Sequence, residues 1–257
     1  MTYVQNIIEA IEAVAPKELQ ESYDNVGLQY GSTDKEVTHV LTCIDITEAV
    51  IDEAINHGCQ MVVSHHPLIF RGVKDLCPES SYINRTLIKA IRHDIALYCA
   101  HTNLDNAEGG VNYKMAEVLE LSDVRPMSEG GIIGSLPSAM NATDFLRLIK
   151  TRFQAGCVCS NITEYKKDKV STVALIGGSG SFGISEAEAL QADAFLTGEI
   201  KYHDYFDHPQ LLLVEAGHYE TEQYTKQLLS DIITKQLPEV KVTESQVRTN
   251  PRSLYHE

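Results

Sequence analysis

The sequence has no run of about 18 consecutive apolar residues, the length that a helix needs to cross a bilayer. It also lacks a C-x-x-C pair, so neither a thiolate zinc site nor a redox dithiol is indicated. Basic residues are scarce, with 21 Lys and Arg against 36 Asp and Glu and a formal net charge of −15. That charge repels phosphate backbones, which argues against nucleic acid as a direct partner.

What is present points to an intracellular protein. Apolar residues at 4–14 recur at helical spacing among charged ones, which predicts an amphipathic helix rather than an export signal. We therefore expect a soluble, cytoplasmic protein with no membrane partner. The six cysteines fall mostly within apolar runs and are predicted to be buried, reduced thiols: Cys43, Cys59, Cys77, Cys99, Cys157 and Cys159.

Short apolar runs alternate with amphipathic stretches along the chain, which is the βαβ pattern of an α/β protein. Residues 37–66 align without gaps with 170–199, and 95–105 match the region 211–222 at a different offset. These matches predict two related α/β domains from an internal duplication. The alternative is that any two βαβ units look alike because both follow strand and helix periodicity.

The boundary between the domains is predicted near 125–141, where glycine and proline punctuate the chain. The first domain would cover 1–125 and be joined by the C-terminal segment 218–257. The second would cover 126–217.

Two adjacent histidines end the apolar strand MVVS. His65 and His66 are followed by Pro67, which favours an extended His66 and prevents a helix from starting there. The carboxyl end of a strand is where open α/β sheets bind ligands. Neighbouring side chains of a strand point to opposite faces, so both rings serve one site only if the chain turns. Otherwise one histidine is packed and the other solvated.

A histidine and a carboxylate four residues later follow two further apolar strands. His101 and Asp105 come after IALYCA, and His218 and Glu222 come after LLLVEAG. In a helix this spacing places both groups on one face. The alternatives are that Asp105 is a helix N-cap with His101 in the core, and that Glu222 is a surface residue.

Four imidazoles and two carboxylates exceed one open tetrahedral site, which needs three protein ligands and a water. Two ions fit this set better, because a carboxylate can bridge a pair of ions. With nitrogen and oxygen donors, Zn, Fe, Mn, Ni and Co are all suitable. We therefore predict two divalent metal ions per chain, of undetermined identity.

A glycine-rich turn, Gly178-x-Gly180-x-x-Gly183, lies between a predicted strand and a predicted helix. It is either a backbone cradle for a substrate phosphate or a tight turn of the second repeat. The remaining histidines show no paired spacing and are predicted to be structural: His39, His57, His93, His203, His208 and His256.

The motifs SHHP (64–67), HTNLD (101–105), TGE (197–199), GHYETE (217–222) and DNVGLQ (24–29) resemble the NIF-three-like family. Its members are commonly labelled GTP cyclohydrolase I type 2 homologues. The resemblance implies two related α/β domains, a toroidal homohexamer and a dinuclear metal centre between the domains. It also implies the short form of the family, without an inserted domain. The implied metal ligands are His65, His66, Asp105, His218 and Glu222, with His101 as a further ligand.

Three functions compete on this evidence. The first is a metal-dependent hydrolase acting on a nucleotide or another phosphate-bearing small molecule, whose catalytic acid and base the sequence does not identify. The second is a non-catalytic metal-binding scaffold that docks protein partners. The third, a dinucleotide-dependent oxidoreductase, rests only on the glycine-rich turn.

Overall fold

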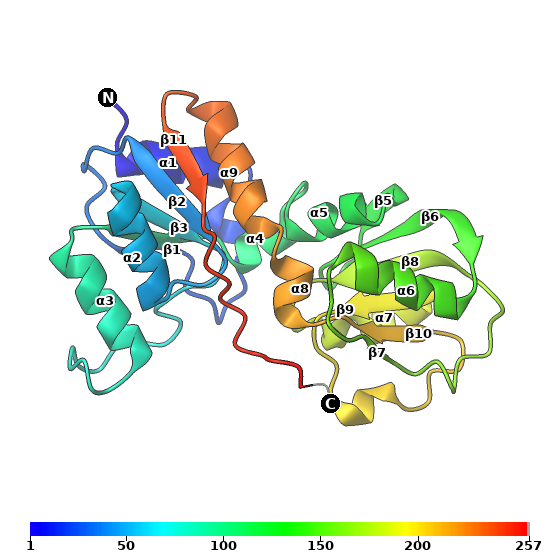
Figure 1. The fold of residues 1–257 in the computed structure, drawn as a ribbon. Coiled ribbons are helices and arrows are strands. Elements are labelled where there is room, and N and C mark those ends of the chain that lie inside the picture. Colours follow the sequence, from blue (N-terminus) through cyan, green and yellow to red (C-terminus); the bar gives the residue numbers. More distant parts are fainter. Residues whose placement is uncertain (256–257) are drawn as a thin grey trace. The chain divides into compact units, whose positions relative to one another are not determined.

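The computed structural model describes residues 1–255, which form two compact units (Figure 1). The first unit comprises Met1–Gly110 and Thr225–Pro251. The second comprises Val111–Tyr224 and the tail from Arg252 onward. Each unit is a sheet covered by helices, so the predicted α/β class is confirmed.

The first unit contains a five-stranded sheet in the order β1-β4-β3-β2-β11. Its three central strands are parallel, β11 adds a parallel edge strand beside β2, and β1 runs antiparallel to β4. The central strands are buried along their whole length, as expected of parallel strands covered on both faces. The strands are β1 Gly27–Tyr30, β2 His39–Cys43, β3 Met61–Ser64, β4 Ala96–Cys99 and β11 Lys241–Glu244.

Two pairs of helices cover this sheet. One apolar cluster joins alternate strand residues to α2 (Glu48–His57) and α3 (Tyr82–Arg92). In the other pair, α1 (Val4–Glu12) packs on α9 (Thr225–Gln236), which contacts β2 and β11. Helix α2 begins after Thr47, whose hydroxyl accepts the N–H of Val50, and ends at Gly58 with a left-handed φ of 68°.

The second unit contains a six-stranded sheet in the order β5-β6-β8-β9-β10-β7. Strands β8, β9 and β10 are parallel, whereas β6 and β7 run antiparallel to their neighbours β8 and β10. The strands are β5 Ser122–Pro126, β6 Ile132–Met140, β7 Cys159–Ser160, β8 Val170–Ile176, β9 Ala194–Thr197 and β10 Leu212–Glu215.

Helices cover both faces of the second sheet. The α5 (Val111–Val118) and α6 (Ala142–Arg152) helices bury their apolar residues against one face. The α7 helix (Ile184–Ala189) packs on the other face. Short elements complete the chain: α4 Thr102–Asn106, α8 His218–Glu222, and the 3-10 turns η1 Lys17–Leu19, η2 Ser181–Gly183 and η3 Tyr202–Tyr205.

Four strands have the same arrangement in both sheets. The order β1-β4-β3-β2 in the first matches β7-β10-β9-β8 in the second, including the antiparallel edge strand. The ladders pair Ser64 with Cys99 and Thr197 with Glu215. This shared topology is compatible with the predicted duplication, which stays a prediction.

The unit boundaries differ from those expected from the sequence. Residues 111–125 and 218–224 belong to the second unit, although they were assigned to the first. Of the glycines and prolines near 125–141, Gly130 and Gly131 form the turn between β5 and β6 and the others lie in these two strands, all inside the second unit. Helix α5 packs against the second sheet, and this apolar contact moves the division towards the N-terminus.

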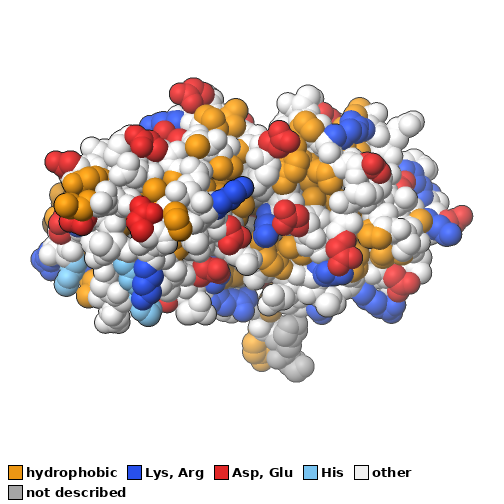
Figure 2. Space-filling model, turned by 90° about the horizontal axis from the view of Figure 1, so that it is seen from above, with side chains coloured by type: hydrophobic (Ala, Val, Ile, Leu, Met, Phe, Trp, Pro, Cys, Tyr) orange, Lys and Arg blue, Asp and Glu red, His pale blue; other side chains and the backbone are white. Residues whose placement is uncertain are grey.

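The expectation for the cysteines was wrong for three of the six. Cys43, Cys59 and Cys99 are buried, whereas Cys77, Cys157 and Cys159 are exposed. On the face shown in Figure 2, acidic and basic side chains are interspersed. Within residues 1–255, none of the helices combines the length and the apolar character that a membrane span requires.

Candidate metal centre

The chain bends at His65 and His66, directly after β3. Such a bend is the condition for both rings to serve one site. Their backbone N–H groups donate to Cys43 and Ile44 at 3.1 and 2.9 Å, which fixes the bend to the last residue of β2 and the residue after it. The two ring centroids are 4.9 Å apart. His65 is fully buried and His66 is partly buried, so neither ring is simply solvated. The turn brings both rings to one place.

His101 joins them from the end of the neighbouring strand β4. It is the N-cap residue of α4, and its own N–H donates to the side chain of Asn103 at 3.0 Å. Its ring centroid lies 5.3 Å from those of both His65 and His66. The three residues each offer one ligand nitrogen, and these atoms lie within 4.8 Å of one another. Such a group is compact enough to share one metal ion.

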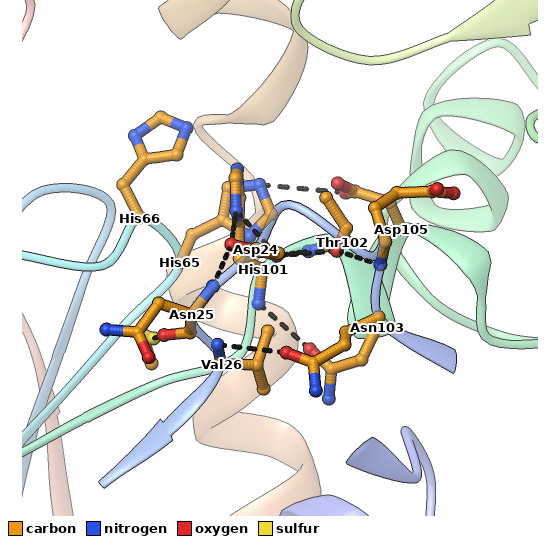
Figure 3. Close-up of polar contacts among 12 residues, drawn as sticks. Asp24, Asn25, Val26, His65, His66, His101, Thr102, Asn103 and Asp105 are labelled. Atoms are coloured by element: carbon orange, nitrogen blue, oxygen red, sulfur yellow. Dashed lines mark hydrogen bonds and ion pairs between the residues drawn. The ribbon is translucent and has the colours of Figure 1, made fainter. Parts of the chain in front are cut away.

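Each of the three rings is oriented by an oxygen acceptor at Nδ1. His65 bonds the carbonyl of Ala100 at 2.9 Å, and His66 bonds the carboxylate of Asp45 at 2.7 Å. His101 lies 2.9 Å from both carboxylate oxygens of Asp24 (Figure 3). These acceptors favour the tautomer with the proton on Nδ1, so Nε2 carries the lone pair that a metal binds.

The two supporting carboxylates stay ionised in this setting. Burial raises the pKa of Asp24, but hydrogen bonds from His101 and Thr102 lower it more, leaving it far below its ordinary value. Burial likewise raises the pKa of Asp45, and hydrogen bonds from His66 and Thr249 outweigh it. Ionised acceptors at Nδ1 make the imidazoles stronger metal ligands.

Asp105 extends the group from within α4. Its carboxylate lies 3.6 Å from Nε2 of His65, on the side where a shared cation would bind (Figure 3). Asp105 is inside the helix and donates its N–H to His101, so it is not the N-cap of this helix. We call His65, His66, His101 and Asp105 the first ligand group.

In the second unit, His218 and Glu222 lie on the short helix α8. His218 Nε2 is 3.2 Å from a carboxylate oxygen of Glu222, which is the one-face geometry expected from their spacing. Glu222 is 3% exposed, so it is not a surface residue. Gly217 precedes the helix with a φ of 103°, a conformation that favours glycine. We call His218 and Glu222 the second ligand group.

The glycine-rich turn packs directly beneath the second ligand group. A Cβ added at Gly178, where φ is 60°, would lie 2.2 Å from a carboxylate oxygen of Glu222. Two N–H groups of this turn already have protein acceptors, because Gly178 donates to Thr221 and Gly180 donates to Thr197. The geometry therefore favours the tight-turn interpretation over a phosphate cradle. In a dinucleotide site the glycine-rich turn leads directly into the helix whose N-terminus binds the phosphate. Here the 3-10 turn η2 and then the short helix α7 follow the turn.

Glu199 supports His218 in the same unit. Its carboxylate lies 3.4 Å from His218 Nδ1 and 3.3 Å from the guanidinium of Arg252, and it accepts the hydroxyl of Ser179 at 2.6 Å. Burial raises the pKa of Glu199, but these three partners lower it by more. Glu199 thus performs for His218 the supporting role that Asp45 performs for His66.

Two exposed aromatic rings adjoin the first ligand group. Phe70 is 41% exposed, and its centroid lies 6.1 Å from the ring of His101. Tyr23 is 64% exposed and contacts Phe70 edge to face at 6.4 Å. Burial raises the pKa of Tyr23, as do the nearby carboxylates of Glu21, Asp24 and Asp105.

Sequence reasoning missed the supporting carboxylates Asp24 and Asp45. Asp24 opens the motif DNVGLQ, one of the motifs that carry the family resemblance, and Asp45 is the second residue after β2. Of the other histidines, His39 bonds a backbone carbonyl and Thr243, as a structural residue does. His256 lies outside the described residues.

The fold and the site together define a mixed α/β protein with two sheets and His/Asp/Glu groups that could hold metal. A model of the Duf34/NIF3 (NGG1p interacting factor 3) family matches residues 2–251. The chain belongs to this family, as the sequence motifs indicated.

Named relatives agree with this assignment. A Streptococcus pneumoniae protein called GTP cyclohydrolase 1 type 2 homolog is 32% identical over 95% of this chain and 97% of its own. A Clostridium perfringens protein of the same name is 34% identical over 85% of this chain and 86% of its own. A crystal structure of a hypothetical protein from Staphylococcus aureus is 28% identical, covers 98% of this chain and 99% of its own, and superimposes with a TM-score of 0.89.

Proposed function

We propose that the chain binds two divalent metal ions and uses them to hydrolyse a nucleotide or another phosphate-bearing small molecule. Each ligand group would supply donors to these ions. The proposed ligands are His65, His66, His101, Asp105, His218 and Glu222.

The observation that carries the proposal is the orientation of the three histidines in the first ligand group. A buried cluster of imidazoles is costly to assemble unless something binds the nitrogens that converge. Here every Nδ1 is held by an oxygen, and the three ligand atoms lie within 4.8 Å of one another. Nitrogen and carboxylate donors without thiolate suit Zn, Fe, Mn, Ni or Co.

The residues would divide the work as follows. The imidazoles and carboxylates would hold the ions, while Asp24, Asp45 and Glu199 keep the rings oriented. Bound divalent ions would supply Lewis acidity for the activation of water and for neutralising negative charge on a substrate. No general acid is assigned among the described residues.

Two features support a ring-bearing, anionic substrate. Phe70 and Tyr23 present exposed aromatic surface beside His101, and planar rings stack on such surfaces. The relatives carry the name GTP cyclohydrolase 1 type 2 homolog, which agrees with a nucleotide. Two divalent cations would offset the acidic net charge near the site.

Metal content is the first test. Elemental analysis of gently purified protein should give two ions per chain in the wild type and one or none in Glu222→Ala. Protein that stays metal-free after reconstitution with Zn, Mn or Fe would refute the proposal at its base.

Turnover is the second test. Metal-loaded protein should hydrolyse a member of a nucleotide and phosphoester panel, and His66→Ala protein that remains folded should not. Phe70→Ala should raise KM more than it lowers kcat if the ring stacks on substrate. A wild type that binds metal but neither binds nor hydrolyses any member of the panel would leave only the scaffold function.

The scaffold alternative has one specific observation in its favour. Tyr202 and Phe206 are 74% and 53% exposed and contact each other with ring centroids 5.5 Å apart. Exposed aromatic clusters are typical of interaction surfaces. A homohexamer, which the family resemblance implies, would be one use of such a surface. Light scattering of the wild type and a Tyr202→Ser/Phe206→Ser variant would show whether these rings support assembly.

A further inference from the structure

The C-terminal tail leaves β11 as an extended segment without regular secondary structure (Figure 1, red). Its start is anchored in the first unit, because Ser245 donates its N–H to Thr42 at 2.8 Å and Gln246 donates to Glu53 at 2.9 Å. From Pro251 onward the described tail residues are exposed.

Thr249 of this tail completes the support of His66. Its hydroxyl donates to one carboxylate oxygen of Asp45, and the other oxygen bonds His66 Nδ1 at 2.7 Å. A carboxylate with only one partner can rotate, whereas this one is held at both oxygens. The orientation of His66 therefore depends on Thr249 through Asp45.

Arg252, slightly further along the tail, makes the equivalent contact in the second unit. Its guanidinium lies 3.3 Å from the Glu199 oxygen that is 3.4 Å from His218 Nδ1. Thus one short segment contacts a supporting carboxylate of each ligand group. Among the histidine ligands, His66 and His218 depend on the tail, whereas His65 is held by the carbonyl of Ala100.

We propose that the tail is a positioning element for the metal centre, in which Thr249 and Arg252 set metal affinity through Asp45 and Glu199. This inference rests on the proposed metal binding. Loss of a group that orients a ligand typically weakens metal binding about 10–100-fold. Release of the tail would therefore lower affinity in both ligand groups together.

The test compares Thr249→Val and Arg252→Gln with their conservative partners Thr249→Ser and Arg252→Lys. Co²⁺ is titrated against a competing chelator, and its visible spectrum reports coordination. We expect the two disruptive variants to bind Co²⁺ more weakly, by at most the roughly 10–100-fold that loss of an orienting group costs, with an altered spectrum, and the conservative variants to restore both. Arg92→Gln, an exposed arginine of α3, should behave as wild type.

A second readout does not depend on metal. Nitrogen NMR of the histidines in metal-free protein should show the Nδ1–H tautomer of His66 losing population in Thr249→Val, and that of His218 in Arg252→Gln. Wild-type affinity, spectrum and tautomers in both variants would overturn the inference. If wild-type protein binds no Co²⁺ but the tautomers shift, the proposed metal binding is wrong, whereas the role of the tail in orienting His66 and His218 is supported.

Discussion

The two ligand groups occupy corresponding places in their sheets but differ in donors. In the first unit three histidines and an aspartate follow β3 and β4, and in the second one histidine and one glutamate follow β10. The exit of β9 carries Glu199, which supports His218, where the first unit has His66. The strand ends thus fix where the candidate ligands lie, whereas the residue types at those ends decide which unit supplies nitrogen donors.

The backbone beneath the two groups differs as well. The segment after β2 contains Asp45, a supporting carboxylate, whereas the aligned position after β8 is Gly178. Gly178 leaves room for the carboxylate of Glu222, which a Cβ would meet at 2.2 Å. At this position the first ligand group therefore has a supporting carboxylate, whereas the second ligand group has no side chain.

The largest expected effect is the loss of the first ligand group in His65→Ala. His65 is fully buried and offers one of the three clustered ligand nitrogens, so its removal should weaken metal binding by more than the roughly 10–100-fold of an orienting residue. Elemental analysis and chelator competition would measure the loss. His39→Ala, which removes another buried histidine from the same unit, is the control and should keep its metal. Equal metal loss in both variants would mean that general destabilisation, not ligation, is responsible.

A smaller effect is expected from Gly178→Ala, a substitution next to Glu222 of the second ligand group. The new Cβ would displace Glu222, and the left-handed backbone adds about 1–2 kcal/mol of strain. Metal bound by the second group should fall while the unfolding free energy drops. Gly58→Ala carries a similar positive φ with open space around its Cβ, so it should lose stability alone. Urea unfolding and metal analysis of both variants would separate strain from displacement. Unchanged metal in Gly178→Ala would contradict the placement of Glu222 as a ligand.

Asp24→Asn tests the support of the first group. The amide keeps the shape but removes the negative charge that holds Nδ1–H of His101, so metal affinity should fall about 10–100-fold. Chelator competition measures the change. The same substitution at Asp144, an exposed residue of α6 in the second unit, should leave affinity unchanged.

The smallest effect concerns stability at acid pH in the second unit. Burial raises the pKa of Asp193, but Lys167 and the N–H groups of Thr172 and Ser171 lower it by more. A depressed pKa stabilises the fold above the unfolded value near 3.9, and this is lost as pH falls through the folded value. Asp193→Asn should therefore be less stable than wild type at pH 7, and the difference should shrink by pH 3. Urea unfolding at both pH values checks this, and a constant difference would exclude the titration of Asp193 as the cause.

Much of the site was predictable because strand ends are local features. The apolar runs before His65, His101 and His218 identify where each strand stops, and the four-residue spacing to a carboxylate identifies a helical face. The bend at His65 and His66 was less certain, because it depends on backbone hydrogen bonds to the segment after β2. Pro67 indicated a turn without fixing its direction.

By itself, the sequence determined the α/β class, the strand ends and the candidate ligands, since each depends on periodicity within a short segment. Only the tertiary structure decided which groups orient those ligands. Asp24 reaches His101, Thr249 reaches Asp45 and Arg252 reaches Glu199 across long stretches of chain. The tertiary structure also decided that Cys157 and Cys159 are exposed and where the boundary between the units lies. Exposure and boundary depend on what packs against a segment and not on its composition.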